Sequence, residues 1–424
     1  MENKFNIVKL SEVTSVIFSG ITPLSGGEAY TDESSGVAFI RSGNIQPDGN
    51  IGGADIFIRP EIHSGIMRNS QVKCNDILIA IVGATIGRVG IFKRDTEANI
   101  NQAIAVVRLN DKRLLPEYVL NYLQSPSGQV YLDYLKRPVA RANINLEEIG
   151  SIGIPTLSLD KQQQLVADMS SASQQRAAKL HEADELFAGM DRFLLEQLRI
   201  DEIPIKSRLA VAVTLGIIKA EKPIGANYYH PERLAVVRAL ENNPAVSTRR
   251  LVDIVNFMRE AVPANNGKPY LGLAGVISNT GELSDVEEEA EGQAFTYEEG
   301  DVLYARLRPY LNKVLYAEKS GVCSTEFHVM RVNNVDVLPE YLTAIMRSKI
   351  IVAQTKHMMT GNTHPRISND DVRNLRVPVP SIDIQYIIVK EMRNRLERSR
   401  LLKREVEAEW AEAKERFERE LIGG

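Results

Sequence analysis

Short apolar runs broken by glycine, asparagine and aspartate dominate the first part of the chain and predict a series of β-strands. The clearest runs are VAFIRSGNI from Val37, DILIAIVG from Asp76, RVGIF from Arg88 and AIAVVRL from Ala103. Apolar residues that alternate or continue over about four to eight positions are typical of half-buried and fully buried strands. This part of the chain is therefore predicted to be rich in β-structure.

Helices are predicted after these strands. Pro116 and Pro339 each start a helical pattern and are followed by a glutamate in the first turn, an arrangement that helix N-termini favour. Further short helices are expected over 146–150 and 369–374. Each leads into a proline-containing extended segment, IPTLSL or VPVPSI, where proline disfavours helix.

Two much longer helices are predicted over 160–198 and 383–421. Both segments lack proline and carry apolar residues at spacings of three and four, with charged residues crowding the other faces of the second. At about 1.5 Å per residue each helix is roughly 55–60 Å long. A stripe of that length cannot be buried on one small domain, so we expect the two helices to pack against each other as an antiparallel coiled coil.

The chain also contains an internal duplication. NDILIAIVGATIGRVGIF aligns with GDVLYARLRPYLNKVLYA, LLPEYVLNYLQS with VLPEYLTAIMRS, and ANINLEEIGSIGIPTLSL with PRISNDDVRNLRVPVPSI, in the same order. The predicted fold is α+β: two similar mixed α/β domains joined by two long antiparallel helices, with pseudo-twofold symmetry. The predicted segments are a first domain (1–157), a long helix (158–200), a lead-in with the second domain (201–380) and a second long helix (381–424).

These features together resemble the specificity subunits of type I restriction-modification systems. The resemblance rests on FIRSGNI, DILIAIVGATIGRVGIF, MTGNTHPRISNDDVRNLRVPVP and the glutamine-bearing helix starts LDKQQQLV and IDIQYIIV, and it covers nearly the whole chain. It implies two target-recognition domains that each read half of a split, asymmetric site on double-stranded DNA. It also implies helices that measure the spacer and dock two DNA adenine methyltransferase subunits, to which motor-nuclease subunits can be added. The stretch IPIKSRLAVAVTLGIIKAEKPIGANYYHPERLAVVRALENN before the second copy has no counterpart before Leu10.

Composition and charge narrow the function further. The chain is 44% hydrophobic and 25% charged, with a net charge of −4, which argues against a protein that coats nucleic acid indiscriminately. Residues 284–299 hold seven acidic residues and no basic one, so this stretch is not expected to face DNA. No long apolar run or signal peptide is evident, and Cys74 and Cys323 form no disulfide framework, so a cytoplasmic protein is expected.

Residues that touch DNA should be polar or basic and lie on loops at matching places in the two copies. In the first domain these candidates are Arg41, Asn44, Arg88, Lys93, Arg137, Arg141 and Asn143. In the second domain they are Arg306, Arg308, Lys313, Lys356, Asn362, Thr363, His364 and Arg366. The loop GNTHPRIS combines hydroxyl, amide and cationic groups and is the leading candidate for a groove or phosphate contact.

No catalytic residue, cofactor or metal site is predicted. The chain lacks an Asn/Asp-Pro-Pro-aromatic motif and a Walker lysine, and its six histidines show no metal-ligand spacing. GATIGRVG fits neither the dinucleotide nor the Walker pattern and is interpreted as a tight turn between strands. Three alternatives stay open: the specificity subunit of a type IIB-like enzyme, a duplicated protein-protein scaffold, and a nuclease whose motif is too loose to recognise.

Overall fold

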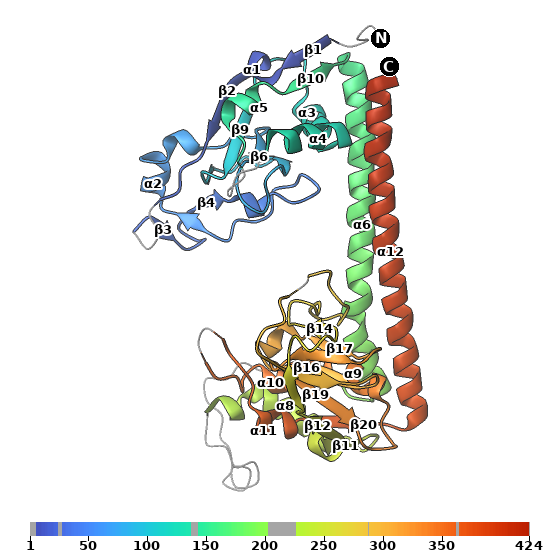
Figure 1. Ribbon diagram of the computed structural model, residues 1–424. Helices are drawn as coiled ribbons and strands as arrows, with labels where there is room; N and C mark the ends of the chain where they lie inside the picture. Colours follow the sequence, from blue (N-terminus) through green and yellow to red (C-terminus); the bar gives the residue numbers. More distant parts are fainter. Residues whose placement is uncertain are drawn as a thin grey trace. The chain divides into compact units, whose positions relative to one another are not determined.

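The computed structural model describes residues 6–23, 28–136, 143–201, 226–286, 288–361 and 364–423. The chain divides into two compact units, residues 1–180 with 404–424, and residues 181–403. Each unit contains one of the two sequence copies and parts of both long helices (Figure 1).

The first unit is built around a four-stranded antiparallel sheet. Its strands lie in the order β2 (Thr14–Ser19), β9 (Ile104–Leu109), β6 (Ile77–Ala80) and β7 (Val89–Ile91). A second sheet has the order β3 (Tyr30–Thr31), β5 (Phe57–Ile58), β4 (Val37–Ile40) and β8 (Ala98–Ile100), in which β4 and β8 are parallel. A separate antiparallel pair joins β1 (Asn6–Lys9) to β10 (Gly153–Thr156).

Both faces of the central sheet are buried, which explains the continuous apolar runs in its strands. Ile77 and Val107 belong to a core that also includes residues of the helices, whereas Leu78 and Val106 belong to a core shared with the second sheet. Because successive residues of a strand point to opposite faces, a strand covered on both sides needs apolar residues at every position. The predicted strands are confirmed here.

Helices cover one face of this sheet. The first unit contains the helices α1 (Leu10–Val13), α2 (Pro60–Ser64), α3 (Pro116–Gln124), α4 (Pro126–Leu135) and α5 (Leu146–Gly150), and the first part of α6 (Leu159–Gln197). The prolines stand at the first helical positions of α2, α3 and α4, where the missing N–H costs nothing. Tyr118 of α3 is fully buried, and its hydroxyl donates to the Pro155 carbonyl at 2.7 Å, so α3 is fixed to β10.

The second unit repeats this plan. Its central sheet has the order β12 (Val255–Met258), β19 (Phe327–Val332), β16 (Val302–Ala305) and β17 (Val314–Tyr316). A further pair joins β11 (Ser247–Arg250) to β20 (Arg376–Val379). Its helices are α8 (Pro231–Glu241), α9 (Pro339–Met346), α10 (Lys349–Thr355), α11 (Asn369–Arg373) and the first part of α12 (Ile382–Gly423). The Tyr341 hydroxyl donates to the Pro378 carbonyl at 2.7 Å, as Tyr118 does to Pro155.

The two copies differ in their second sheets. In the second unit the order is β13 (Ala261–Pro263), β15 (Gln293–Tyr297), β18 (Gly321–Ser324) and β14 (Tyr270–Leu271). Both copies contain a parallel pair, β4 with β8 in the first and β14 with β18 in the second. In the first copy the antiparallel strand β5 lies beside β4, whereas in the second the antiparallel strand β15 lies beside β18. The duplication has therefore kept the central sheet and changed the sheet beside it.

The long helices pack against each other within each unit, as predicted. In the first unit Leu165 and Met169 of α6 share a core with Trp410 and Phe417 of α12. In the second unit Leu194 of α6 shares a core with Ile388 and Val389 of α12, and Arg398 pairs with Glu182 at 3.3 Å. The start of each helix meets the end of the other, so the packing is antiparallel in both units.

Each long helix is tied to its own domain by a buried glutamine. Gln162 accepts from the Leu115 N–H at 2.9 Å and donates to the carbonyls of Arg113 at 2.7 Å and Leu157 at 2.9 Å. Gln385 makes the same three bonds, to Leu338, Asp336 and Pro380, at 2.9, 2.7 and 2.9 Å. Both side chains are fully buried, which explains why a glutamine stands near the start of each long helix.

Among the described residues, no helix is both long and apolar enough to cross a membrane. The segment boundaries predicted from the sequence stay predictions, because the division into compact units cuts through both long helices.

Candidate nucleic-acid interface

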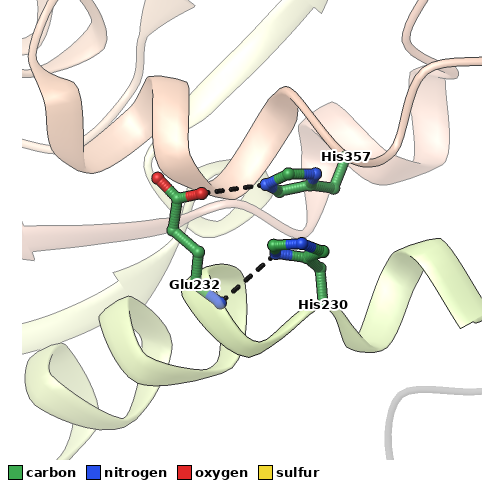
Figure 2. A group of neighbouring side chains, drawn as sticks. All are labelled: His230, Glu232 and His357. Carbon is green, nitrogen blue, oxygen red and sulfur yellow. Dashed lines mark hydrogen bonds and ion pairs between the residues drawn. The ribbon is translucent and has the colours of Figure 1, made fainter. Parts of the chain in front are cut away.

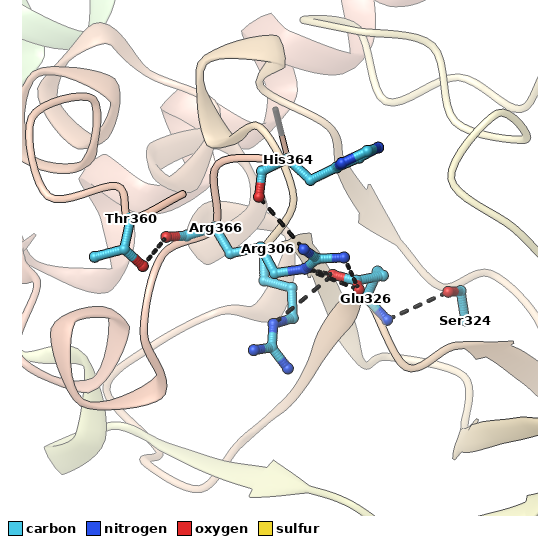
Figure 3. Close-up of polar contacts among 6 residues, drawn as sticks. All are labelled: Arg306, Ser324, Glu326, Thr360, His364 and Arg366. Atoms are coloured by element: carbon cyan, nitrogen blue, oxygen red, sulfur yellow. Dashed lines mark hydrogen bonds and ion pairs between the residues drawn. The ribbon is translucent and has the colours of Figure 1, made fainter. Parts of the chain in front are cut away.

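Four of the predicted DNA-contacting residues lie together in the second unit, and Figure 3 shows three of them, Arg306, His364 and Arg366. The segment after β16 runs antiparallel to the segment before α11: the Ile367 N–H donates to the Arg306 carbonyl at 3.1 Å, and the Arg308 N–H donates to the Pro365 carbonyl at 2.8 Å. Between these bonds, Leu307 faces Arg366 in an isolated bridge. The arrangement brings Arg306, Arg308, His364 and Arg366 onto one loop pair, although they lie up to sixty residues apart in the sequence.

Glu326 organises the charge of this loop pair. The Arg366 Nε lies 3.0 Å from each Glu326 carboxylate oxygen and its Nη2 lies 2.8 Å from Oε1, so the pair is bidentate. Arg306 approaches the same carboxylate at 3.8 Å. The side-chain hydrogen bond with Glu326 raises the pKa of Arg366, which is therefore charged at every physiological pH. The Arg366 side chain remains 40% exposed, so the carboxylate orients it without burying it.

The backbone beside Arg308 has an unusual conformation. Arg308 and Asn312 have φ values of 48° and 52°, in the left-handed region that side chains other than glycine rarely adopt, and they flank the short helix η5 (Pro309–Leu311). The Asn312 amide donates to the Arg347 carbonyl at 2.6 Å and so anchors the end of this turn. Arg308 itself is exposed. Such conformations persist where the surroundings impose them and concentrate at functional sites.

The first unit has the same backbone frame with different side chains. Val82 faces Asn143 in an isolated bridge, and the Ile144 N–H donates to the Ile81 carbonyl at 3.1 Å, as Ile367 does to Arg306. Asn143 is therefore the structural counterpart of Arg366, and both are partly or fully exposed. Arg88 is exposed on the adjoining turn, where its Nη1 donates to the Ile45 carbonyl at 3.3 Å.

The segment GATIGRVG lies within this frame as a tight turn. Gly83 and Gly87 have φ values of 90° and 88°, which glycine adopts without strain. The turn lies between the end of β6 and the start of β7, as predicted.

Several other candidates make contacts inside the protein. The Asn44 side chain accepts from the Arg41 N–H at 2.8 Å and donates to the Gly53 carbonyl at 2.8 Å, and Arg41 pairs with Asp55. Lys93 donates to Asn75 at 2.7 Å and pairs with Glu117, and Lys313 donates to the Leu273 carbonyl at 2.7 Å. These contacts give Asn44, Lys93 and Lys313 a role in holding loops together, and the interface proposed below does not include them. The predicted residues Arg137, Arg141, Asn362 and Thr363 lie outside the described residues.

Lys356 belongs to a separate cluster, in which it pairs with Glu232 at 2.6 Å. Figure 2 shows the other members of this cluster, His230 and His357, beside Glu232. The other Glu232 oxygen lies 2.9 Å from the His357 Nε2, and the His357 ring stacks on His230 with centroids 3.4 Å apart. Burial, together with neighbouring His357, lowers the pKa of His230. Histidine spacing gave no hint of this group, because His230 and His357 come from the start of α8 and the end of α10.

Two histidines and a glutamate are the donor set of many zinc sites, so this cluster is the part of the described structure best suited to a metal. The rings lie 15° from parallel, however, and the lone pairs of two stacked imidazoles do not converge on one point. Glu232 is also already bonded through both oxygens, to Lys356 and to His357. The contacts observed fit a clamp between α8 and α10 rather than a metal site.

One residue of this region, Glu326, was missed by reasoning from the sequence. Glu326 belongs to no motif. Its counterpart in the first copy is Ala103, because the Glu326 carbonyl accepts from the Arg306 N–H and the Ala103 carbonyl from the Ile81 N–H, both at 2.9 Å. Only this difference between the copies could have drawn attention to Glu326. His328 is 4% exposed on β19, and its Nε2 has no hydrogen-bond partner among the described residues. Burial, reinforced by nearby Arg306, lowers the pKa of His328 to about 3.

Comparisons with known proteins agree with this architecture. Residues 3–183 and 246–408 match the family model described as type I restriction modification DNA specificity domain. The chain is 36% identical over 99 residues to the specificity subunit of type I restriction enzyme EcoBI of Escherichia coli, covering 23% of this chain and 21% of that protein. It is 26% identical over 110 residues to the EcoDI specificity subunit of the same organism, covering 26% and 23%. These alignments thus span less than a quarter of either relative.

One solved structure matches this chain with a TM-score of 0.52. It is described as “Structural basis underlying complex assembly and conformational transition of the type I R-M system”. The match covers 98% of this chain and 96% of the other at 14% identity, so it supports the fold alone.

Proposed function

Because the chain belongs to the family of type I restriction-modification DNA specificity domains, we propose that it is a non-catalytic subunit that reads a split, asymmetric site on double-stranded DNA. Each unit would read one half of the site with the loop pair described above. The unit that holds Arg306, Arg308, His364 and Arg366 would read one half, and the unit that holds Arg88 and Asn143 would read the other.

The observation that carries this proposal is one backbone frame with two sets of side chains. The bridges Val82 to Asn143 and Leu307 to Arg366 occupy the same place in the two units, next to the same central sheet. Exposed positions tolerate substitution with little change in stability, so asparagine and arginine can alternate here and change the groups that the frame presents without disturbing the fold. Two readers that recognise different half-sites would need such a change, because base edges are distinguished by the donors and acceptors placed against them.

The long helices would serve as the spacer and as the docking surface for two DNA adenine methyltransferase subunits, to which motor-nuclease subunits can be added. The proposal is supported by the packing of both helices in each unit and by the buried Gln162 and Gln385, which tie each helix to its own domain. A rigid connection is what half-site spacing requires, since spacing then follows from protein geometry.

Footprinting of the full chain with its co-purified methyltransferase tests this function. We expect two protected patches separated by a gap whose sequence can be changed without loss of affinity. A single contiguous patch, or affinity no higher than for unrelated DNA, would support a protein-protein scaffold instead. Cutting of DNA by this chain alone in the presence of divalent metal would show a nuclease and would contradict a non-catalytic role.

A further inference from the structure

Within the proposed function, we infer that Arg366, held by Glu326, forms a guanine-binding subsite in the second unit, and that Asn143 forms the equivalent adenine-binding subsite in the first. The inference rests on that function and adds the identity of one base in each half-site. It comes from the geometry of the Arg366 side chain and from the set of residues that differ between the copies.

The first step is the hydrogen-bond inventory of Arg366. A guanidinium carries five N–H groups. Glu326 accepts from the side that holds Nε and Nη2, at 2.8 to 3.0 Å, and the His364 carbonyl accepts from Nη1 at 3.3 Å (Figure 3). Three of the five N–H groups thus have acceptors among the described residues, and each terminal nitrogen keeps one more N–H to donate. The remaining Nη2 N–H lies at the end of the guanidinium beside Nη1, where the two nitrogens can donate in parallel to a pair of adjacent acceptors.

That remaining fork matches guanine. Guanine presents O6 and N7 as two adjacent acceptors in the major groove, and an arginine fork that donates to both is the commonest base-specific contact. The Arg366 side chain is 40% exposed, so the fork is accessible. Since Glu326 already fixes the plane of the guanidinium, little side-chain entropy would be lost when the base binds.

The second step is the comparison of the copies. The counterparts of Arg366, Glu326 and Arg306 in the first unit are Asn143, Ala103 and Ile81, each identified by the same backbone bond or bridge. The carboxylate that orients the arginine is thus absent where the arginine is absent. This coordinated exchange indicates that Glu326 is present to position Arg366. A surface ion pair with no further role would not need to occupy this shared position.

Asn143 leads to a different base by the same reasoning. Its amide presents an NH2 donor group beside a carbonyl acceptor, and these match N7 and the N6 amino group of adenine. Asn143 is exposed at the bridge with Val82. The two half-sites would therefore differ at the position that these counterparts contact.

The test begins with selection of binding sites from a random-sequence duplex library by the full chain bound to its methyltransferase. In the half-site of the second unit, we expect one guanine whose replacement by adenine, or by 7-deazaguanine, lowers affinity roughly 10- to 100-fold. Arg366→Lys keeps the charge but loses the fork, so this discrimination should fall to about threefold or less while affinity for unrelated DNA is retained. Glu326→Gln should reduce the discrimination several-fold.

One control and one further variant separate the outcomes. Lys319→Ala removes an exposed positive charge from the same unit and should leave the discrimination unchanged. Asn143→Ala should relax one adenine in the other half-site only. If Arg366→Lys keeps the discrimination, Arg366 contacts phosphate and the inference is wrong although the split site remains. If the wild-type complex selects no sequence at all, the proposed function itself is wrong.

Discussion

Replacement of Gln162 by alanine should destabilise the first unit far more than the loss of one polar side chain from the surface would. The side chain is fully buried and makes three hydrogen bonds at 2.7 to 2.9 Å, to backbone groups of Leu115, Arg113 and Leu157. Each bond contributes about 1 kcal/mol, and a buried backbone group left without a partner costs about 1–3 kcal/mol. Because water can satisfy part of this loss in the space left by the side chain, we expect a total of about 2–5 kcal/mol.

Native-state hydrogen exchange is the suitable assay, because it assigns the loss to a region of the chain. Gln162→Ala should increase exchange in α3 and β10, and Gln385→Ala should do the same in α9 and β20. Gln163→Ala is a matched control on the same helix, where the side chain is exposed, and should change the free energy of opening by less than about 0.5 kcal/mol. A loss below about 1 kcal/mol for Gln162→Ala, or a loss equal to that of Gln163→Ala, would show that the three hydrogen bonds do not hold the helix to its domain.

Three further predictions concern the second unit. Burial lowers the pKa of His328 to about 3, so as the pH falls the unfolded chain takes up the proton first. The free energy of unfolding should therefore fall by about 1.4 kcal/mol per pH unit below about 6.5. His328→Leu should flatten this slope in denaturant titrations. A slope that persists in the variant would contradict this. Glu232→Gln leaves Lys356 without its carboxylate and should lower the free energy of unfolding by about 1–3 kcal/mol in thermal unfolding. EDTA should leave the melting temperature of the wild-type protein unchanged, and a lower melting temperature with EDTA would reveal a bound metal. Arg308→Ala should reduce the slope of log affinity against log salt by about one, and an unchanged slope would exclude a phosphate contact.

Much of the fold follows from hydrophobic periodicity and from the duplication. The long helices were predicted over 160–198 and 383–421, and the structure has them at Leu159–Gln197 and Ile382–Gly423. Long, strongly periodic segments are predictable because the apolar stripe repeats many times. The helices α4 and α10 were not predicted, since each is short and immediately follows another helix.

The candidate site was less predictable. The sequence identified the loop with His364 and Arg366, because polar and cationic residues cluster there. It did not identify Glu326, which meets Arg366 only through the antiparallel pairing of distant segments. For the same reason it did not show that Asn44 and Lys93 bond to their own unit, which depends on contacts with Gly53, Asn75 and Glu117. Side-chain partners across a fold are set by tertiary packing, which local pattern does not encode.

In the proposed function the paired helices set the distance between the two half-sites, and lengthening both helices measures whether they do. Four residues inserted at facing positions of α6 and α12 add about 6 Å, close to one helical turn. With DNA rising about 3.4 Å per base pair, the spacer selected from a random library should lengthen by about two base pairs while both half-sites stay the same. An unchanged spacer, or altered half-site sequences, would contradict the account.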